Sequence, residues 1–441
     1  MPSAVLRDSL PEHWELSQEF FQTTPSDDPW WDSFQDTLLC SLIKEAVSNN
    51  FNVLAAQKRI EAAAQMSRAT KAGYYPSVGV SGGWNRNRMA GGMTSAVAPS
   101  TVESYFSLGL TMSWEIDVFG RIRSKLKSDK ANYDATVAEY DATLVSLVSN
   151  LAKAYFQLRL AQEQVGIAEK NIEEHEKLLH IAKTRYDVGL SPVVDVLQAE
   201  MVVIKTQSTL PGLKSDITTY INEIAVLMGV YPEKLQYLRT VRPLPQSPLP
   251  GIVTDPQGLL RRRPDIVEAE KTLAQAAAQV GIAKKDFLPT LSLTAGIGTE
   301  AHSLKDLFGR NSLYYSIMPT LSWTIFDGMA RNAQLAEARL DFEAQIDSYN
   351  LTVMTAIQEV NNAMNSWQTI SEQLQNDETL LNQARMILSK QVERYRDGLN
   401  DFSDVATAVS DVLTYENTLA SSRAAQLTAI VTLYTALGGG F

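Results

Sequence analysis

Two long seams of apolar side chains, one in each half of the sequence, limit most strongly what this chain can fold into. Across residues 133–186, alternating steps of four and three positions reach apolar or aromatic side chains everywhere except at His175. A second seam in the same register crosses residues 342–395. A spacing of about 3.5 residues sustained for this long is typical of a coiled coil. One helix over about residues 120–188 would be on the order of 100 Å long, at about 1.5 Å per residue, so we expect no compact globular domain.

The two halves of the chain repeat the same motifs at a fixed distance. Residues 185–190 (RYDVGL) recur about 209 residues later as residues 394–399 (RYRDGL). Residues 75–78 (YPSV) likewise match residues 288–291 (LPTL). Each half therefore predicts the same order of elements: a helix, a strand pair, a long helix, a tight turn and a second long helix.

Each long helix ends at a Gly-Leu pair. Gly189 and Gly398 permit the left-handed backbone conformation that stops a helix. Pro192 suits a first helical turn and predicts that a second helix starts directly after the first turn. We therefore expect two antiparallel helical hairpins, with returning helices at about residues 192–228 and 402–437.

Alternating apolar and polar residues predict four strands between the helices. The alternation is clearest in residues 106–116 and 313–325, and weaker partner strands cover residues 78–84 and 291–297. An isolated strand of this kind is more often part of a soluble amphipathic hairpin. Here the long helices leave no compact core for such a hairpin, and an apolar face of about 11 residues matches a membrane-spanning strand of about 9 to 11 residues. Four strands are too few for a barrel, which needs about eight, so closure would require oligomerisation.

Charge and composition exclude several other classes of function. The formal net charge of -11 argues against a nucleic-acid partner, because phosphate binding requires clustered Lys and Arg. The single cysteine, Cys40, cannot form an internal disulfide, and the four histidines lack metal-ligand spacing. The glycines at 438–440 lack the strand, Lys and Ser or Thr of a phosphate loop, which leaves a helix stop as their role. We therefore expect no catalytic residues, no metal site and no cofactor.

Membrane insertion through a helix is not expected from the sequence. No run of residues reaches the roughly 18 to 20 apolar positions of a transmembrane helix. Residues 1–10 lack the charged and then apolar leader of an export signal, so we interpret Met1 as the start of a mature form. Insertion would have to occur through strands.

Five motifs, taken in order, carry a specific resemblance to a known family. They are WWDSF at 30–34, WEIDVFG at 114–120, LRRRPDI at 260–266, WTIFDG at 323–328 and ALGGG at 436–440. Through them the chain resembles the outer-membrane efflux protein family over nearly its whole length, and within that family the OprM/NodT branch, which is related to TolC.

The resemblance implies a mixed α and β fold and a homotrimer. Each protomer would give four strands to a 12-stranded transmembrane β-barrel in outer-membrane lipid, and its helices to a coiled-coil periplasmic tunnel. The location would be the outer membrane of a Gram-negative bacterium, and the partners would be a periplasmic membrane-fusion adaptor and an inner-membrane pump of the RND type. Many members of this branch carry a lipidated N-terminal cysteine. No cysteine precedes Cys40 here, so the chain does not support lipidation.

The combined patterns divide the chain into four parts. We expect an N-terminal extended segment (1–35), a first repeat (36–229) with strands at about 76–118 and a helical hairpin at about 120–229, a Pro-rich linker (230–256), and a second repeat (257–441) with strands at about 289–327 and a hairpin at about 328–437. The linker would lie in the equatorial region of the tunnel.

The resemblance places a pore gate at the periplasmic ends of the hairpins. Asp195 and Asp404 each follow a tip glycine by six residues. By similarity to TolC, Asp404 falls where a ring of aspartates narrows the pore, whereas Asp195 and Tyr395 fall on a hydrogen-bonded network that holds the tip closed. Asn400 stands where TolC has a basic partner, which implies a weaker polar contact. Thr407 stands where many relatives have another acidic residue.

Both aspartates also suit a purely structural role. A carboxylate favours the first turn of a helix by roughly 0.5 to 1 kcal/mol, and for either residue alone a helix cap explains its position as well as a gate does. In a trimer, three like charges about 5 Å apart would repel by roughly 1 to 3 kcal/mol per pair. Such a ring would favour cations and respond to pH.

Two further groups of residues are candidates for function. The exposed tips, which would dock the adaptor or merely stop the helices, consist of Gly189, Leu190 and Ser191 in the first hairpin and Gly398, Leu399 and Asn400 in the second. Trp84, Trp114 and Trp323 are candidates for an aromatic belt, because indole rings favour membrane interfaces. Core packing is the alternative for Trp323. For the arginines at 261–263, a helix start before Pro264 is favoured over an anion site.

The leading interpretation is a passive outer-membrane duct of a tripartite, RND-type efflux system that conducts drugs or other small solutes. A duct for heavy metals or for type I protein secretion is an alternative, because the sequence of the duct hardly separates these cargoes. A trimeric coiled-coil scaffold without a pore is the alternative from another class. The alternating strands argue against it, since a scaffold needs no polar face opposite a lipid-facing one.

Overall fold

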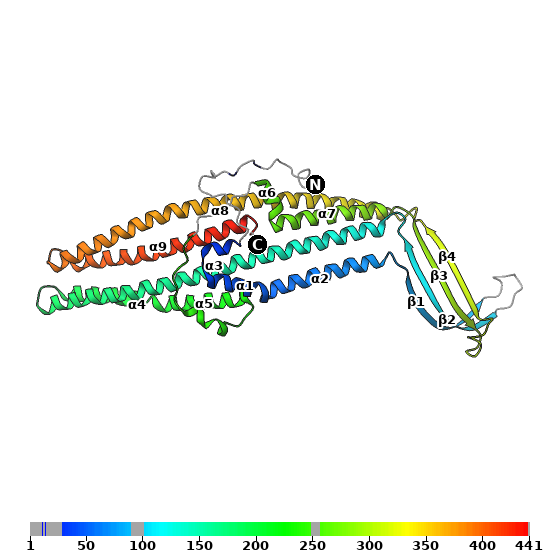
Figure 1. Ribbon diagram of the computed structural model, residues 1–441, viewed down its shortest axis with the longest axis horizontal. Coiled ribbons are helices and arrows are strands. Elements are labelled where there is room, and N and C mark those ends of the chain that lie inside the picture. Colours follow the sequence, from blue (N-terminus) through cyan, green and yellow to red (C-terminus); the bar gives the residue numbers. More distant parts are fainter. Residues whose placement is uncertain (1–10, 12–13, 15–28, 90–100, 248–255, 440–441) are drawn as a thin grey trace. The chain divides into compact units, whose positions relative to one another are not determined.

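The computed structural model describes residues 11, 14, 29–89, 101–247 and 256–439 (Figure 1). Its elements are η3 (Trp30–Phe34), α1 (Thr37–Asn49), α2 (Phe51–Ala72), β1 (Ser77–Met89), β2 (Thr101–Ile116), α3 (Arg121–Asp187), α4 (Val193–Gln207), α5 (Leu210–Met228), η4 (Pro232–Arg239), α6 (Pro256–Arg262), α7 (Pro264–Lys285), β3 (Thr290–Ala301), β4 (Leu313–Ser322), α8 (Ala330–Arg396) and α9 (Phe402–Ala436). The predicted mixture of helices and strands is confirmed. Most of the predicted N-terminal segment, the loop at 91–100, the linker from 248 to 255 and Gly440 lie outside the described residues.

The chain forms two compact units, and each unit takes segments from both halves of the sequence. The helical unit consists of Met1–Lys58, Ala138–Val267 and Asn350–Phe441, and the sheet unit consists of Arg59–Val137 and Glu268–Tyr349. Units and sequence repeats thus divide the chain differently, because equivalent segments of the two repeats pack together.

The two long helices bury the middle of the seams that the sequence predicts, whereas Tyr186 at the tip end is exposed. α3 and α8 each contain 67 residues. Within the helical unit, Leu151 and Leu158 on α3 are fully buried, as is Val360 on α8. The polar seam residue His175 is also buried, and its Nδ1 lies 3.2 Å from Oγ1 of Thr206 on α4. The buried imidazole of His175, which interrupts the apolar seam, therefore has a hydrogen-bond partner in a hydroxyl group of the returning helix.

The returning helices differ between the two repeats. In the second repeat α9 is continuous, and it lies beside α8 (Figure 1). In the first repeat the predicted single helix over 192–228 is wrong, because Ser208 and Thr209 separate α4 from α5. Pro211, at the start of α5, cannot donate a backbone hydrogen bond, and its ring would clash with the carbonyl four residues earlier in a continuous helix.

Aromatic residues close the core of the helical unit around η3. The Trp30 ring stacks on Tyr434 of α9 at a centroid distance of 5.4 Å, and Phe34 lies 5.1 Å from Phe156 of α3. Asp36 then starts α1, because its carboxylate accepts hydrogen bonds from two backbone N–H groups of the first turn, at 2.9 and 3.1 Å.

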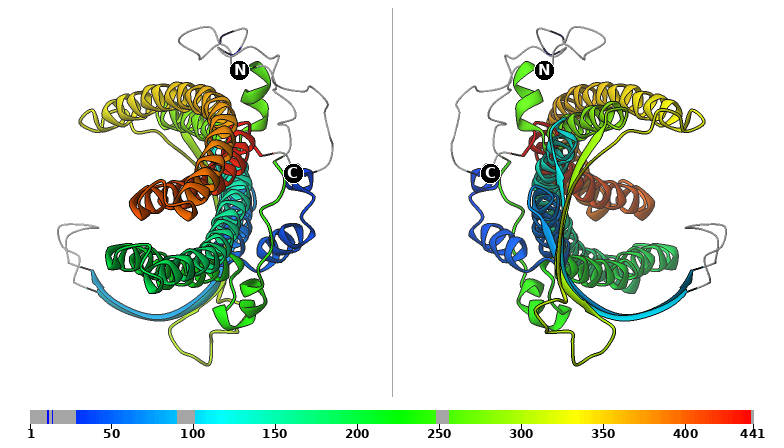
Figure 2. Two further views of the ribbon diagram at one scale, coloured as in Figure 1. Left: turned by 90° about the vertical axis from the view of Figure 1, so that its left-hand side faces the viewer. Right: turned by 90° about the vertical axis from the view of Figure 1, so that its right-hand side faces the viewer.

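β1, β2, β3 and β4 form one antiparallel sheet in sequence order, and this sheet is curved (Figure 2). The pairing is continuous, so every second residue lies on the same face. One face carries mainly apolar side chains, among them Val78, Val80, Trp84, Phe106, Leu108, Leu110, Met112, Leu291, Leu293, Ile297, Leu313, Tyr315, Ile317 and Leu321. The opposite face carries mainly Ser, Thr, Gly and Asn. The predicted two-faced alternation is confirmed.

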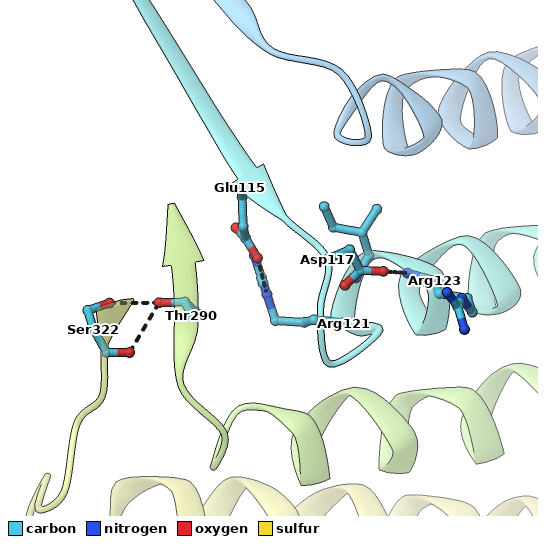
Figure 3. Close-up of polar contacts among 7 residues, drawn as sticks. Glu115, Asp117, Arg121, Arg123, Thr290 and Ser322 are labelled. Carbon is cyan, nitrogen blue, oxygen red and sulfur yellow. Dashed lines mark hydrogen bonds and ion pairs between the residues drawn. The ribbon is translucent and has the colours of Figure 1, made fainter. Parts of the chain in front are cut away.

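The end of β2 is fixed to the start of α3 by charged side chains (Figure 3). The Glu115 carboxylate binds the Arg121 guanidinium at 2.7 Å. Asp117 accepts hydrogen bonds from the backbone N–H groups of Ile122 and Arg123, both at 3.0 Å, and so caps α3. All four strands thus have their helix-connected ends at the same side of the sheet.

Candidate pore gate and docking tips

The two hairpin tips share one backbone conformation. Gly189 has φ +75° and Gly398 has φ +73°, which is the left-handed region that favours glycine. In each tip the leucine N–H donates to the carbonyl of the arginine five residues earlier, at 2.8 and 2.9 Å, which closes the last helical turn. Leu190 and Leu399 are 67% and 66% exposed. The tips therefore stop the helices and also present two apolar side chains to the exterior of the chain.

A buried hydrogen bond joins the two hairpins just inside the tips. The Tyr395 hydroxyl on α8 donates to Oδ2 of Asp195 on α4 at 2.9 Å, and these residues are only 3% and 7% exposed. The Tyr395 ring packs edge-on against Phe402 of α9, with centroids 5.4 Å apart. Burial, and then the hydrogen bond to Asp195, raise the pKa of Tyr395, so the phenol stays protonated and donates at neutral pH.

Asp404 has a different environment from Asp195, although both follow a tip glycine by six residues. Asp404 is exposed on α9, and within the described residues its side chain has no hydrogen-bond partner. Both carboxylates lie in the first turn of their helices, α4 and α9, where a negative charge is favourable, so the structural role stays open beside the gate for each of them. Of the two, only Asp195 contacts the other hairpin.

Asn400 bonds within its own hairpin. Its Nδ2 donates to Oε1 of Gln391 at 2.8 Å, and its Oδ1 is buried without a partner among the described residues. This bond ties the tip turn to the end of α8 within one hairpin, and the replacement of a charged lock by Asn400 stays a prediction.

Arg185 bridges the hairpins, and the sequence interpretation gave it no role. Its guanidinium lies 5.0 Å from the centroid of the Tyr395 ring, and its Nη1 donates to the carbonyl of Arg396 at 2.6 Å. The signal was present in the repeated RYxxGL motif, but that motif was used only to define the repeat. A basic partner thus reaches the network from α3 of the first hairpin.

A second polar bridge between the hairpins, also missed, lies farther from the tips. Glu416 on α9 accepts a hydrogen bond from Nδ2 of Asn171 on α3 at 2.6 Å, and it pairs with Nη2 of Arg385 on α8 at 2.6 Å. The Glu416 side chain is only 10% exposed. Charge-assisted bonds of this kind are stronger than neutral ones, so this bridge reinforces the contact between the hairpins.

The three candidate tryptophans lie at the two ends of the sheet. Trp114 and Trp323, at the helix-connected end, each donate from Nε1 to a backbone carbonyl at 3.0 Å, those of Tyr74 and Phe287. Trp84 lies near the opposite end and is 56% exposed. Trp323 is 59% exposed, so it does not pack in the core of its own chain, and the aromatic belt stays a prediction.

The arginine run lies between two helices: Arg261 and Arg262 are in the last turn of α6, and Arg263 directly precedes the expected helix start at Pro264. α7 begins at Pro264, and the buried Arg263 pairs with Asp265 at 2.6 Å and with Glu359 at 2.7 Å. The guanidinium of Arg263 is thus paired with two carboxylates of the same chain, which favours a structural role over an anion site. Across the part of the chain that the structure describes, no three His, Cys, Asp or Glu side chains are grouped so that they could hold a metal ion. No helix in the same part is both long and apolar enough to cross a membrane.

Known proteins are similar to this chain both in sequence and in fold. Residues 42–230 and 256–439 match the model of the outer membrane efflux protein family. The chain is 28% identical over 423 residues to the toluene efflux pump outer membrane protein TtgF of Pseudomonas putida, with 95% of this chain and 87% of that protein covered. It is 29% identical over 416 residues to the cation efflux system protein CusC of Escherichia coli, with 93% and 88% covered.

Solved structures of outer-membrane channels have the same fold as this chain. The outer-membrane channel OprN superposes with a TM-score of 0.90 at 29% identity, and a structure of CusC with 0.87 at 27% identity; in both cases the alignment covers 99% of each chain. The family model covers most of the sequence, and the fold of these channels is shared over its whole length. The chain therefore belongs to the outer membrane efflux protein family, whose members are channels of the outer membrane.

Proposed function

We propose that three copies of this chain form a passive efflux duct through the outer membrane, with their sheets closed into one 12-stranded barrel. The observation that carries this proposal is the sheet itself. Within the described residues β1 and β4 each pair on one side only, and one face is apolar and largely exposed, with Val80 at 74% and Ile317 at 68%. Open edges are satisfied when β4 of one copy pairs with β1 of the next, and four strands per copy are too few to close alone.

The hairpin tips act as the periplasmic gate in this proposal. The hydrogen bond between Tyr395 and Asp195 holds the two hairpins of each protomer together, and Arg185 packs over the aromatic ring of Tyr395. Threefold symmetry would bring three copies of the exposed Asp404 around the axis. The negative charge of these three carboxylates favours cations. Because the carboxylates also repel one another, the tips stay closed only while the Tyr395 contacts hold the hairpins together.

The exposed tips dock a periplasmic adaptor, which connects the duct to an inner-membrane pump of the RND type. Support comes from the exposure of Leu190 and Leu399, since apolar side chains at the end of a long helical hairpin suit a helix-tip contact. The matched relatives are named for toluene and for cation efflux, at nearly equal identity. We propose that the pump selects the cargo and that the duct conducts what the pump delivers.

Conductance in planar bilayers tests the duct. The purified chain should form ohmic, long-lived pores with low conductance at rest, because the tips are held closed. A protein that inserts into bilayers and never conducts would support the non-conducting scaffold instead.

A further inference from the structure

Basic residues are concentrated in the first turns of α3, directly after β2. Five of the first ten residues of α3 are Lys or Arg, whereas two of the first ten residues of α8 are, although both helices follow a strand of the sheet. Arg121 pairs with Glu115. The other cations lack this explanation, because a positive charge near the N-terminus of a helix opposes the helix dipole. Helix stability therefore does not account for these basic residues.

Three of these residues, Arg123, Lys127 and Lys130, lie on one side of α3. Successive helical residues are about 100° apart, so the three span about 60° and their centre lies about 150° from Arg121. Arg121 reaches back to Glu115, which is on the polar face of the sheet. Arg121 and Arg123 accordingly point in different directions (Figure 3). The three basic side chains therefore lie on the side of α3 that continues the apolar face of the sheet.

Within the described residues, no carboxylate is paired with these three side chains. All three are exposed, and none of them forms an ion pair or a side-chain hydrogen bond in that part of the chain. Asp117 is engaged as the cap of α3, where it accepts hydrogen bonds from two backbone N–H groups at 3.0 Å. Asp134 ends the stripe one helical turn beyond Lys130. This side of α3 is therefore positively charged over about its first three turns.

α2 extends the same surface with two exposed basic residues. Its end contacts α3, because a Cβ at Gly73 would lie 3.5 Å from Cδ1 of Ile122. The two helices run antiparallel (Figure 1), so a twofold axis perpendicular to their common plane relates them, and a residue that follows a contact residue lies on the same side in both. Lys71 follows the buried Thr70 as Arg123 follows the buried Ile122. The basic collar, as we name this surface, consists of Arg68, Lys71, Arg123, Lys127 and Lys130.

The length of the apolar face places the basic collar at the level of the lipid headgroups. On β2 this face extends from Phe106 to Ile116, which is about 34 Å of strand, or about 25 Å along the membrane normal at a tilt of about 40°, equal to the apolar band of outer-membrane barrels. α3 begins at Arg121, five residues after Ile116. From Arg123 to Lys130 the helix rises about 10 Å, and its side chains lean toward its N-terminus and so toward the membrane. The headgroup layer is about 5 to 8 Å thick, and its attraction extends about 8 to 10 Å farther at physiological salt.

We propose that the basic collar binds the phosphate groups of anionic phospholipids in the inner leaflet of the outer membrane. This inference rests on the proposed insertion of the sheet into that membrane. Anionic lipids attract basic residues that directly adjoin a membrane-spanning segment. A lipid is favoured over a protein partner or a soluble anion, because the collar continues the lipid-facing side of the sheet and the apolar face directly above it offers a surface for acyl chains.

A lipid titration tests the collar. The full chain in maltoside micelles is titrated with phosphatidylglycerol and with phosphatidylcholine of the same acyl chains, and Kd is measured by native mass spectrometry. The wild type should bind phosphatidylglycerol at least about 10-fold more tightly, and R123Q/K127Q/K130Q should reduce this preference to less than about 3-fold. Glutamine suits a helix as well as lysine does, so the variant should remain folded.

The matched pair of single variants is K127Q and K125Q. Lys125 is also exposed and lies at nearly the same depth, but it is about 40° from Arg121 and therefore on the side of the polar face. K127Q should lower the preference for phosphatidylglycerol by about 2-fold or more, whereas K125Q should leave it unchanged. K127R, which keeps the charge, should behave like the wild type.

Three results would overturn the inference. The first is equal binding of the two lipids by the wild type, and tighter binding of soluble peptidoglycan fragments would then assign the collar to the cell wall. The second is a preference that R123Q/K127Q/K130Q retains in full, and the third is an equal loss in K125Q and K127Q. Insertion into vesicles and bilayer conductance are read separately. If these are normal while any of the three results holds, only the lipid site is wrong. If the wild type does not insert, the proposed duct and this site both fail.

Discussion

Replacing Tyr395 with Phe tests the gate most specifically, because it removes one hydroxyl and leaves the packing of the ring on Phe402 unchanged. The hydroxyl donates to Asp195 at 2.9 Å in a buried environment. A hydrogen bond to a charged group contributes about 1.5 to 3 kcal/mol, and the variant also leaves the carboxylate buried without this donor. Loss of that contribution should raise the equilibrium constant for separation of the two hairpins by about 10- to 150-fold.

The matched control for Tyr395→Phe is Tyr186→Phe. Tyr186 occupies the equivalent position of the first repeat, but it is 46% exposed and makes no side-chain hydrogen bond within the described residues. Single-channel recordings in planar bilayers should show a higher open probability for Tyr395→Phe and none of this change for Tyr186→Phe. In cells, only Tyr395→Phe should admit a large hydrophilic antibiotic. If intact Tyr395→Phe trimers open as rarely as the wild type and the control, the buried bond does not hold the gate.

Three further predictions follow from the same geometry. Asp404→Ala should weaken cation preference, measured as a smaller reversal potential in a KCl gradient, because the exposed carboxylate ring is removed; full selectivity retained between about pH 4 and 8 would place the ring elsewhere. Leu190→Asp combined with Leu399→Asp should abolish efflux in cells and leave assembly and insertion intact, since both side chains are about two-thirds exposed; unchanged drug resistance would reject docking at the tips. Burial lowers the pKa of His175 below its ordinary 6.5, so the unfolded chain binds the proton more readily than the folded chain. The free energy of unfolding should therefore fall as the pH drops below about 6.5, by at most about 1.4 kcal/mol per pH unit. His175→Gln should make this pH dependence less steep in thermal unfolding, and an unchanged pH dependence would assign it to other groups.

The long helices and the faces of the strands could be predicted from sequence because their periodicity is local. The seam predicted a helix over about 120–188, and α3 spans Arg121–Asp187. The alternation of apolar residues likewise predicted the correct face for Phe106 and Leu110 on β2. The break before α5 was signalled by Pro211 but was not recognised, since the repeat suggested a continuous helix like α9.

The contacts at the gate were only partly predictable. Tyr395 and Asp195 were paired through resemblance, and the structure brings them together. Arg185 could not be placed by spacing, because its contacts with Tyr395 and Arg396 join segments about 210 residues apart and depend on how the two hairpins pack. The exposure of Asp404 against the burial of Asp195 was also invisible in the sequence, because both residues have the same spacing from glycine.

The stoichiometry of the assembled protein tests the central proposal most directly. Native mass spectrometry of the detergent-solubilised chain measures the number of copies without assuming any shape. Since β1 and β4 are the open edges of a four-stranded sheet, the account predicts three copies in every conducting particle. A stable monomer, or a conducting assembly with another number of copies, would contradict it.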